Sequence, residues 1–191
     1  MIYSLIVPVL LIAWFVASYN GFIKLRNRTD EAWSDIEIQL KRRFDLIPNL
    51  VETVKGYATH EKTTLDEVVE ARSKATQINI DPSNITHENM QKFSEAQAGL
   101  SQTLGKLLAL SESYPDLKAN QNFMQLTQEL SDTENKIQSA RRFFNGNARD
   151  LNIKIESFPS NIIAKIFHFS KKEFFDIPDN GAEYQPVAVK F

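Results

Sequence analysis

The chain has 191 residues, of which 42% are hydrophobic and 24% charged, and its formal net charge at pH 7 is −2. This length suits one domain with a substantial core plus an anchor. The 22 basic residues are balanced by 24 acidic ones, which argues against an extended basic surface and therefore against nucleic-acid binding. The chain contains no cysteine, so disulfides, thiolate nucleophiles and cysteine-ligated metals are excluded.

The amino-terminal segment predicts a membrane anchor. Residues 1–18 carry no charge and are mostly large and apolar, and a spanning helix needs about 20 such residues, with ~17 as a practical minimum. Trp14 and Tyr19 lie near the end of this segment, as is typical of a membrane interface. A cleaved signal peptide is the alternative, but no basic residue precedes the apolar core and Val16–Ser18 is a weak cleavage site. We therefore expect a retained anchor in contact with the lipid bilayer.

The charges that flank the anchor predict its orientation. Lys24, Arg26 and Arg28 follow the apolar segment, whereas no basic residue precedes it. Basic residues concentrate on the cytoplasmic side of membrane spans. We expect the amino terminus to face outward and the bulk of the chain to be cytoplasmic.

Residues 33–57 predict a long amphipathic helix. Seven of the eight heptad a and d positions in this stretch are apolar, and the exception is Arg43. Pro48 lies within the pattern and should kink the helix, because proline lacks an N–H donor. No helix breaker separates Tyr19 from this stretch, so the anchor should run directly into the helix, which should end near Gly56.

Later segments repeat the helical spacing. Helical patterns cover residues 65–75, 90–107 and 123–151, separated by turn-forming stretches at 79–84 and 114–116. A strand-like alternation at 151–158 is too short to change the class. The prediction is an all-α protein, in which a transmembrane helix continues into an elongated antiparallel bundle of three to four long helices, followed by a short C-terminal helix. A helix of about 40 residues would be ~60 Å long.

The C-terminal part is rich in apolar and aromatic residues. The candidates for interaction are Phe158, Ile162, Ile163, Phe167, Phe169, Phe174 and Phe175. Two interpretations stay open: a short helix that folds back to cap the bundle, or an exposed patch that contacts a partner or the membrane. The expected organisation is an anchor at 1–18, a bundle at 19–177 and an extended tail at 178–191.

No motif predicts catalysis. The His-Glu pairs at 60–61 and 87–88 begin like a zinc-protease motif, but Thr64 and Gln91 stand where the second histidine is needed. Phosphate loops, dinucleotide fingerprints and nucleophile elbows are missing from the sequence. We predict no catalytic residue, no cofactor and no metal site.

Polar residues within the apolar patterns carry the most information about a site. They are Arg43, Asp45, Asn49, Glu134 and Arg141. A buried charge requires a partner, and the first interpretation is a satisfied polar layer that fixes the register of the helices. A binding pocket between helices is the second interpretation, and an enzyme that uses this group is the third.

Several stretches together are specific to one family. They are Gln39–Val51, Gly56–Ala58, Tyr114–Asn120, Thr133–Asn135 and the Phe158-Pro159 pair. In these stretches the chain resembles the LemA family of bacterial membrane proteins, and the resemblance covers nearly the whole sequence. Two pairs depart from the family pattern: Phe144-Asn145 stands where Tyr-Asn is common, and Leu151-Asn152 replaces a second such pair.

The resemblance implies an amino-terminal span at the bacterial inner membrane, a cytoplasmic bundle of long antiparallel helices and no established enzymatic activity. We expect a non-enzymatic scaffold or adaptor that self-associates into a homo-oligomer and binds proteins at that membrane. The alternative is a regulatory subunit or partner of a membrane-embedded zinc metalloprotease in envelope stress, because the family resemblance implies association with membrane stress proteins.

Overall fold

The computed structural model describes residues 2–82 and 85–175, and every regular element in these ranges is a helix. The helices are α1 (Ile2–Lys55), α2 (Lys62–Gln77), α3 (His87–Ala109), the 3-10 turn η1 (Leu110–Glu112), α4 (Pro115–Lys118), α5 (Gln121–Glu156) and α6 (Ser160–Ile166). The all-α prediction and the short C-terminal helix are confirmed. The expected tail at 178–191 lies outside the described residues.

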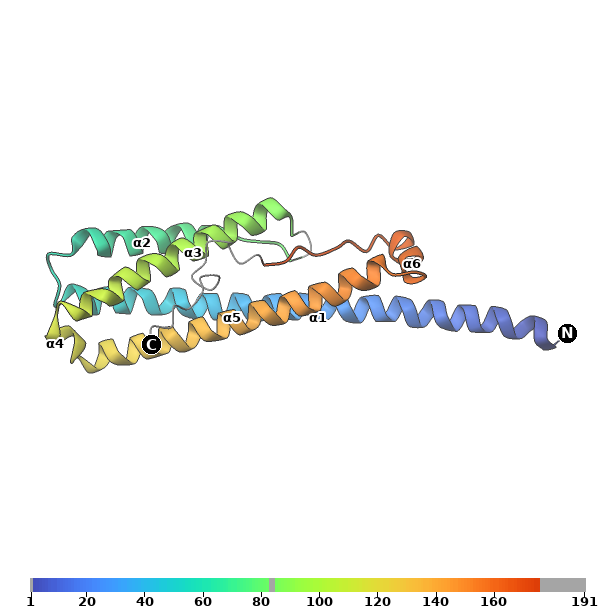
Figure 1. The fold of residues 1–191 in the computed structure, drawn as a ribbon, viewed down its shortest axis with the longest axis horizontal. Helices are drawn as coiled ribbons and strands as arrows, with labels where there is room; N and C mark the ends of the chain where they lie inside the picture. The colour runs from blue at the N-terminus through green and yellow to red at the C-terminus, as the bar shows by residue number, and fades with distance from the viewer. Residues whose placement is uncertain (1, 83–84, 176–191) are drawn as a thin grey trace, which may run out of the picture.

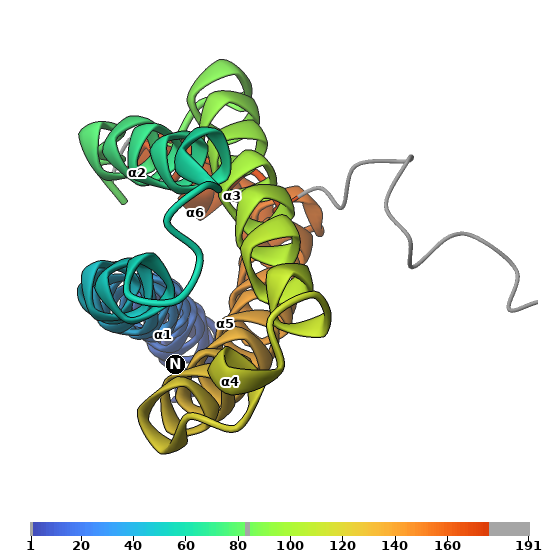
Figure 2. The ribbon, with the colours of Figure 1, turned by 90° about the vertical axis from the view of Figure 1, so that its left-hand side faces the viewer.

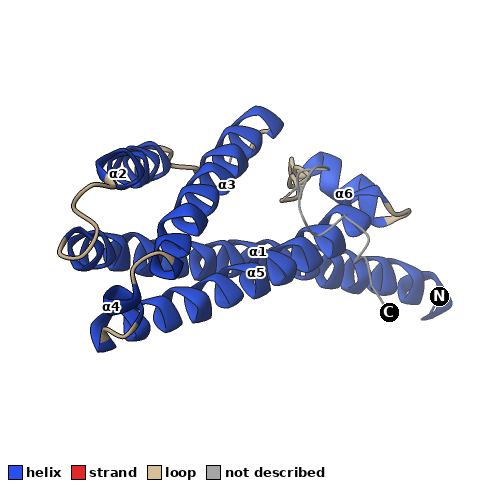
Figure 3. Cartoon of the chain, turned by 60° about the vertical axis from the view of Figure 1, so that its left-hand side comes forward, coloured by secondary structure: helices blue, strands red, loops and turns tan. Residues whose placement is uncertain are grey.

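The two longest helices form the central pair of the bundle. Helices α1 and α5 lie side by side and antiparallel, and the amino-terminal part of α1 continues alone past α6 (Figure 1). The α2–α3 hairpin packs over the far half of α1, as the end-on view shows (Figure 2). The cartoon in Figure 3 contains helices and loops only, over the part of the chain that is described. The bundle is therefore elongated, as predicted.

Helix α1 runs from the apolar amino-terminal segment to the end of the amphipathic stretch as one helix, as predicted. It contains 54 residues, which corresponds to about 80 Å. Its apolar heptad positions, such as Trp33, Ile36 and Val54, are buried against the other helices. The side chains of residues 6–16 are exposed in contrast. The same helix thus changes from an exposed apolar segment to the central element of a core.

Pro48 lies inside α1 without ending it. Proline has no N–H, so the carbonyl of Phe44, four residues earlier, loses its helical donor. Arg72 of α2 replaces that donor, since its Nε donates a hydrogen bond of 2.9 Å to the Phe44 carbonyl oxygen. The proline position is therefore a point at which α2 is joined to α1.

This replacement predicts a coupling between two substitutions. Arg72→Met should lower the free energy of unfolding by about 1–2 kcal/mol, because it leaves the Phe44 carbonyl without a donor. In a Pro48→Ala background the restored N–H can bond that carbonyl. Arg72→Met should then lower the free energy of unfolding by markedly less. Urea unfolding of the four full-length variants in micelles, followed by circular dichroism, measures the cycle. Equal costs in both backgrounds would contradict the replacement.

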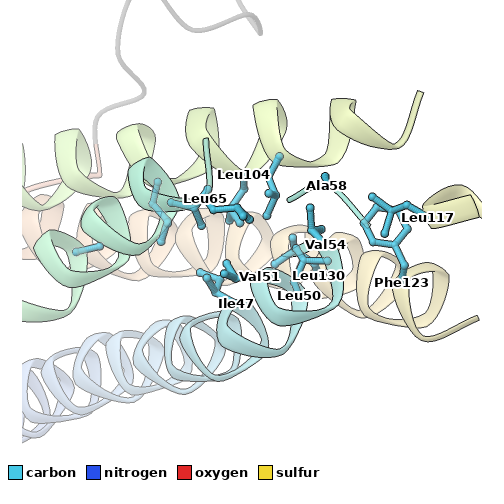
Figure 4. Close-up of a cluster of buried hydrophobic side chains, with 14 residues drawn as sticks. Ile47, Leu50, Val51, Val54, Ala58, Leu65, Leu104, Leu117, Phe123 and Leu130 are labelled. Atoms are coloured by element: carbon cyan, nitrogen blue, oxygen red, sulfur yellow. The ribbon is translucent and has the colours of Figure 1, made fainter. Parts of the chain in front are cut away.

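Buried side chains form three clusters along the rod. The cluster farthest from the amino terminus joins residues of α1 through α5, and Figure 4 shows these side chains meeting between the helices. A middle cluster contains Trp33, Phe93 and Phe144. A third cluster, nearest the anchor, consists of Phe22, Leu151, Ile163 and Ala164. The core is thus distributed along the length of the α1–α5 pair.

The boundaries of the later helices follow from their capping residues. Thr86 accepts a hydrogen bond from the Asn89 amide at the start of α3, and Asn120 accepts one from the Phe123 amide at the start of α5. Helix α5 continues to Glu156, so the strand-like alternation at 151–158 does not form a strand. The segment is helical rather than extended there because Leu151 is buried against Phe22 of α1.

Candidate functional site

A fully buried arginine lies at the middle of the bundle. The Nη1 atom of Arg43 in α1 donates to Glu134 of α5 at 2.7 Å and to Ser101 of α3 at 3.2 Å, and its Nη2 donates to the Gln97 side-chain oxygen. The Arg43 side chain has no exposed surface, whereas that of Glu134 is 35% exposed. One cation therefore connects three helices.

The electrostatics of this group are those of a structural cation. Burial lowers the pKa of Arg43 from its ordinary value, and the neighbouring Glu134 carboxylate opposes that shift. A guanidinium offers only donors, so the amide oxygen of Gln97 must face it. The layer contains one salt bridge and neutral hydrogen-bonding groups, without a nucleophile paired to a base. This arrangement can hold helices in register.

The structure brings together only part of the polar set considered from the sequence. Arg43 and Glu134 form the ion pair. Asp45 and Asn49 lie on the exposed face of α1. Arg141 lies elsewhere on α5, with its guanidinium carbon 5.2 Å from the centre of the Phe175 ring. Heptad position alone indicated which residue of α1 points inward, since Asp45 and Asn49 are off the a and d positions.

The buried pair predicts unequal costs of substitution. Glu134→Ala should destabilise the protein by about 2–3 kcal/mol, a value lowered for its partial exposure, because it leaves a buried cation without its counter-charge. The double variant Arg43→Met/Glu134→Ala should lower the free energy of unfolding by less than Glu134→Ala alone, since it also removes the cation. Urea unfolding of the full-length protein tests this, and simple additivity of the two costs would argue against the pair.

An aromatic cluster lies on the anchor side of the Arg43 layer. The Phe175 ring stacks on Trp33, with 5.5 Å between ring centroids, and meets Phe144 edge-on at 5.6 Å and Phe93 at 5.9 Å. Phe175 thus enters the core from a segment that follows the last helix. Arg141 covers the outer side of the same ring.

Two asparagines hold the segment that carries Phe175. Asn145 donates to the Phe175 carbonyl at 3.0 Å and accepts from the Phe175 amide at 2.8 Å. Asn152, seven residues later, does the same for Lys172, at 2.8 and 2.9 Å. Each side-chain amide therefore pairs with the backbone of one residue as a neighbouring strand would. We call residues 168–175, which run along α5 in this way, the C-terminal strap.

These asparagines were missed as site residues in the sequence. The available signal was the repeated pair of an apolar residue and asparagine, 144–145 and 151–152, at heptad spacing. The apolar member of each pair is buried, and the asparagine that follows it faces the strap. The sequence did not show what those asparagines would bind, because the strap has no periodic pattern.

The chain enters the strap through a helix-ending motif at His168. This residue has a φ of 55°, in the left-handed region. The Phe169 amide donates to the Ala164 carbonyl at 2.9 Å, and the His168 amide donates to the Lys165 carbonyl at 3.4 Å. That pair of bonds is a Schellman motif. It turns the chain so that Phe169 stacks on Phe22 of α1, with 4.7 Å between centroids.

Lys172 is a second tie between the strap and the rest of the bundle. Its side chain is 6% exposed, its ammonium lies 3.5 Å from the Asp30 carboxylate of α1, and it donates to the carbonyl of Pro82. The strap is thereby joined to α1, to α5 and to the α2–α3 connection. Beside it lies a surface hollow of about 350 Å³, lined in part by Arg26 and His168.

The asparagine pairs predict local changes in hydrogen exchange. Asn145→Ala should speed exchange of the Phe175 amide by roughly tenfold, and Asn152→Ala that of Lys172, because each loses the acceptor of its amide. Asn147→Ala is the matched control, since Asn147 bonds only the Phe143 carbonyl within α5. Exchange rates at 172 and 175 that match those of the control would show that the asparagines do not hold the strap.

The C-terminal apolar candidates divide into two groups. Ile163 and Phe175 are buried, and Phe169 is partly buried in ring contacts. The remaining candidates keep a substantial exposed fraction; they are Phe158, Ile162, Phe167 and Phe174. The segment therefore combines both interpretations that the sequence left open: one face of α6 caps the bundle, while the other remains uncovered.

These features define a class of protein: a rod-shaped helical bundle with one helix, α1, long and apolar enough to cross a membrane. Over the residues described, no group of three metal-binding side chains is assembled. The LemA family profile matches residues 32–191. Because that match covers most of the sequence, the chain belongs to the LemA family, as its motifs indicated.

Relatives of the chain carry two kinds of name. It is 28% identical over 171 residues to protein LemA of Metamycoplasma hominis, covering 85% of this chain and 74% of that protein. It is 25% identical over 192 residues to magnetosome protein MamQ 1 of Paramagnetospirillum magneticum, and the alignment covers 92% of this chain and 71% of that protein. It is 24% identical over 189 residues to magnetosome protein MamQ of Magnetospirillum gryphiswaldense, and the alignment covers 90% of this chain and 70% of that protein. These names do not describe enzymes.

Proposed function

We propose that this protein is a membrane-anchored, non-enzymatic scaffold that self-associates and binds proteins at the bacterial inner membrane. The observation that carries the proposal is the continuity of α1 from its exposed apolar segment into the buried core. A continuous helix transmits the orientation of the anchor to the body, because bending it would break backbone hydrogen bonds. The orientation of the rod thus follows that of the anchor.

The membrane anchor is supported by exposure as well as by composition. Family membership and the long apolar helix indicate a membrane-associated protein. The apolar side chains of residues 6–16 are exposed; Val9, for example, is 63% exposed. An apolar stretch of this size is unfavourable in water and stable in lipid. The basic residues Lys24, Arg26 and Arg28 support a cytoplasmic location for the body.

The non-enzymatic part of the proposal rests on the polar residues of the core. Arg43, whose pKa is lowered by burial, is enclosed between helices, and its terminal nitrogens bond Glu134, Ser101 and Gln97. Functional groups with shifted pKa values generally face a cleft that a substrate can enter. The Arg43 layer lacks such access, since its guanidinium has no exposed surface.

Self-association is supported by apolar side chains left on the outside of the rod. Phe143 of α5 is 56% exposed and Ile38 of α1 is 58% exposed. Both belong to the helix pair that is rigidly continuous with the anchor. Anchoring in one bilayer confines neighbouring copies to parallel orientations, so weak contacts between rods are multiplied by a high local concentration.

The oligomeric state tests this proposal. The full-length protein extracted in mild detergent should give the mass of a homo-oligomer by light scattering, and Phe143→Ser should shift it toward the monomer. Val69→Ser is the matched control, because Val69 is 52% exposed but lies on α2. A monomer at all concentrations would refute self-association, and a different protein at fixed ratio would make this chain a subunit. Intact mass of the membrane-extracted protein should include residues 1–18; their loss would show cleavage.

A further inference from the structure

Helix α6 leaves a row of apolar side chains uncovered. Ile163 and Ala164 are buried against Phe22 and Leu151, so the inner face of this short helix is part of the core. On its outer face Ile162 is 50% and Ile166 57% exposed, and Phe158, in the turn just before the helix, is 81% exposed. Residues 162 and 166 are four apart and so lie on one edge of α6, while Phe158 precedes them in the turn.

This row lies at the level where the apolar segment of α1 ends. The Phe167 ring, at the end of α6, has its centroid 4.7 Å from that of Tyr19 and 5.9 Å from that of Phe15. Phe167 is itself 42% exposed. Figure 1 shows α6 beside α1 at the point where α1 emerges from the bundle. The exposed row is therefore continuous with the surface of the proposed anchor.

The length of the anchor places the edge of the bilayer at this same level. The helical stretch Ile2–Ser18 is ~25 Å long, shorter than the ~30 Å hydrocarbon layer of a typical membrane. The following turn, Tyr19–Ile23, has no charge, and the first charged residue is Lys24. A membrane that covers the whole uncharged stretch would extend to about Phe22, against which α6 is packed.

The charges around α6 suit a lipid surface. Lys165 is exposed on α6, and Lys24 and Arg26 lie on α1 just beyond the uncharged turn. Long basic side chains extend from apolar surroundings to reach anionic headgroups. A soluble partner would have to displace lipid to reach Phe158, Ile162 and Ile166 at this level, whereas the bilayer is already adjacent to them.

We propose that Phe158, Ile162, Ile166 and Phe167 insert into the interfacial layer of the bilayer that α1 spans, giving the protein a second membrane contact. This inference rests on the proposed anchoring of α1. A single helix leaves the body free to rotate about the helix axis and to tilt. A second contact to one side of α1 limits the tilt, because tilting away from that side would lift α6 out of the lipid.

Site-directed spin labelling tests the contact, and the absence of cysteine from the chain makes single labels simple to place. The full-length variants Ile162→Cys and Ile166→Cys would be labelled with a nitroxide and reconstituted in nanodiscs of phosphatidylcholine and phosphatidylglycerol. Collision with oxygen, which partitions into lipid, is compared with collision with a water-soluble nickel complex. Val69→Cys is the control for a solvent-exposed site, and Val9→Cys reports the anchor; both parent side chains are exposed in the structure.

Labels at 162 and 166 should favour oxygen over nickel at least severalfold more than the label at 69, with a depth between that of 69 and that of 9. Nickel accessibility equal to that at 69, with 9 still in lipid, would overturn the second contact and leave the anchor intact. Shielding from both reagents would mean that protein covers the row, which also overturns it. Nickel access at 9 would refute the anchor itself. Circular dichroism of each variant confirms that the labelled protein is folded.

Discussion

The whole structure depends on the continuity of one helix. Helix α1 supplies both the exposed apolar segment and one wall of every core cluster. Because the side chains of residues 6–16 stay exposed, the bundle packs mainly along the part of α1 that follows, and α5 runs beside that part. The α2–α3 hairpin covers the end far from the anchor. An elongated rod is therefore the shape this constraint permits.

Side chains satisfy backbone groups at irregular points of the fold. Arg72 bonds the carbonyl that Pro48 leaves without a donor, and two asparagines on α5 pair with the backbone of the strap. Buried backbone groups that lack partners are costly, so each of these contacts allows an irregular feature within a packed bundle. Each also joins segments that are distant in sequence. The irregular features thereby become the points at which the elements are held together.

The polar and aromatic layers have separate structural roles that bear on function. The Arg43 layer joins three helices, an arrangement in which a buried polar group can specify alignment as it does in coiled coils. The aromatic layer around Phe175 draws the strap into the core and so positions the chain that follows α6. Both layers leave α6 at the anchor end of the rod. The proposals of scaffolding and of a second membrane contact for this LemA-family protein therefore rest on the exposed surfaces outside these two layers.

The sequence by itself determined the all-helical class, the approximate helix boundaries, the apolar amino terminus and the need of Arg43 for a partner. These are local properties, since helical periodicity and turn chemistry are read within a few residues. The tertiary structure decided that this partner is Glu134, 91 residues away, that Asp45 is exposed, and that Asn145 holds Phe175. It also decided which face of α6 is buried. Such pairings depend on how distant segments meet, and without a repeating pattern in the strap no local signal could specify them.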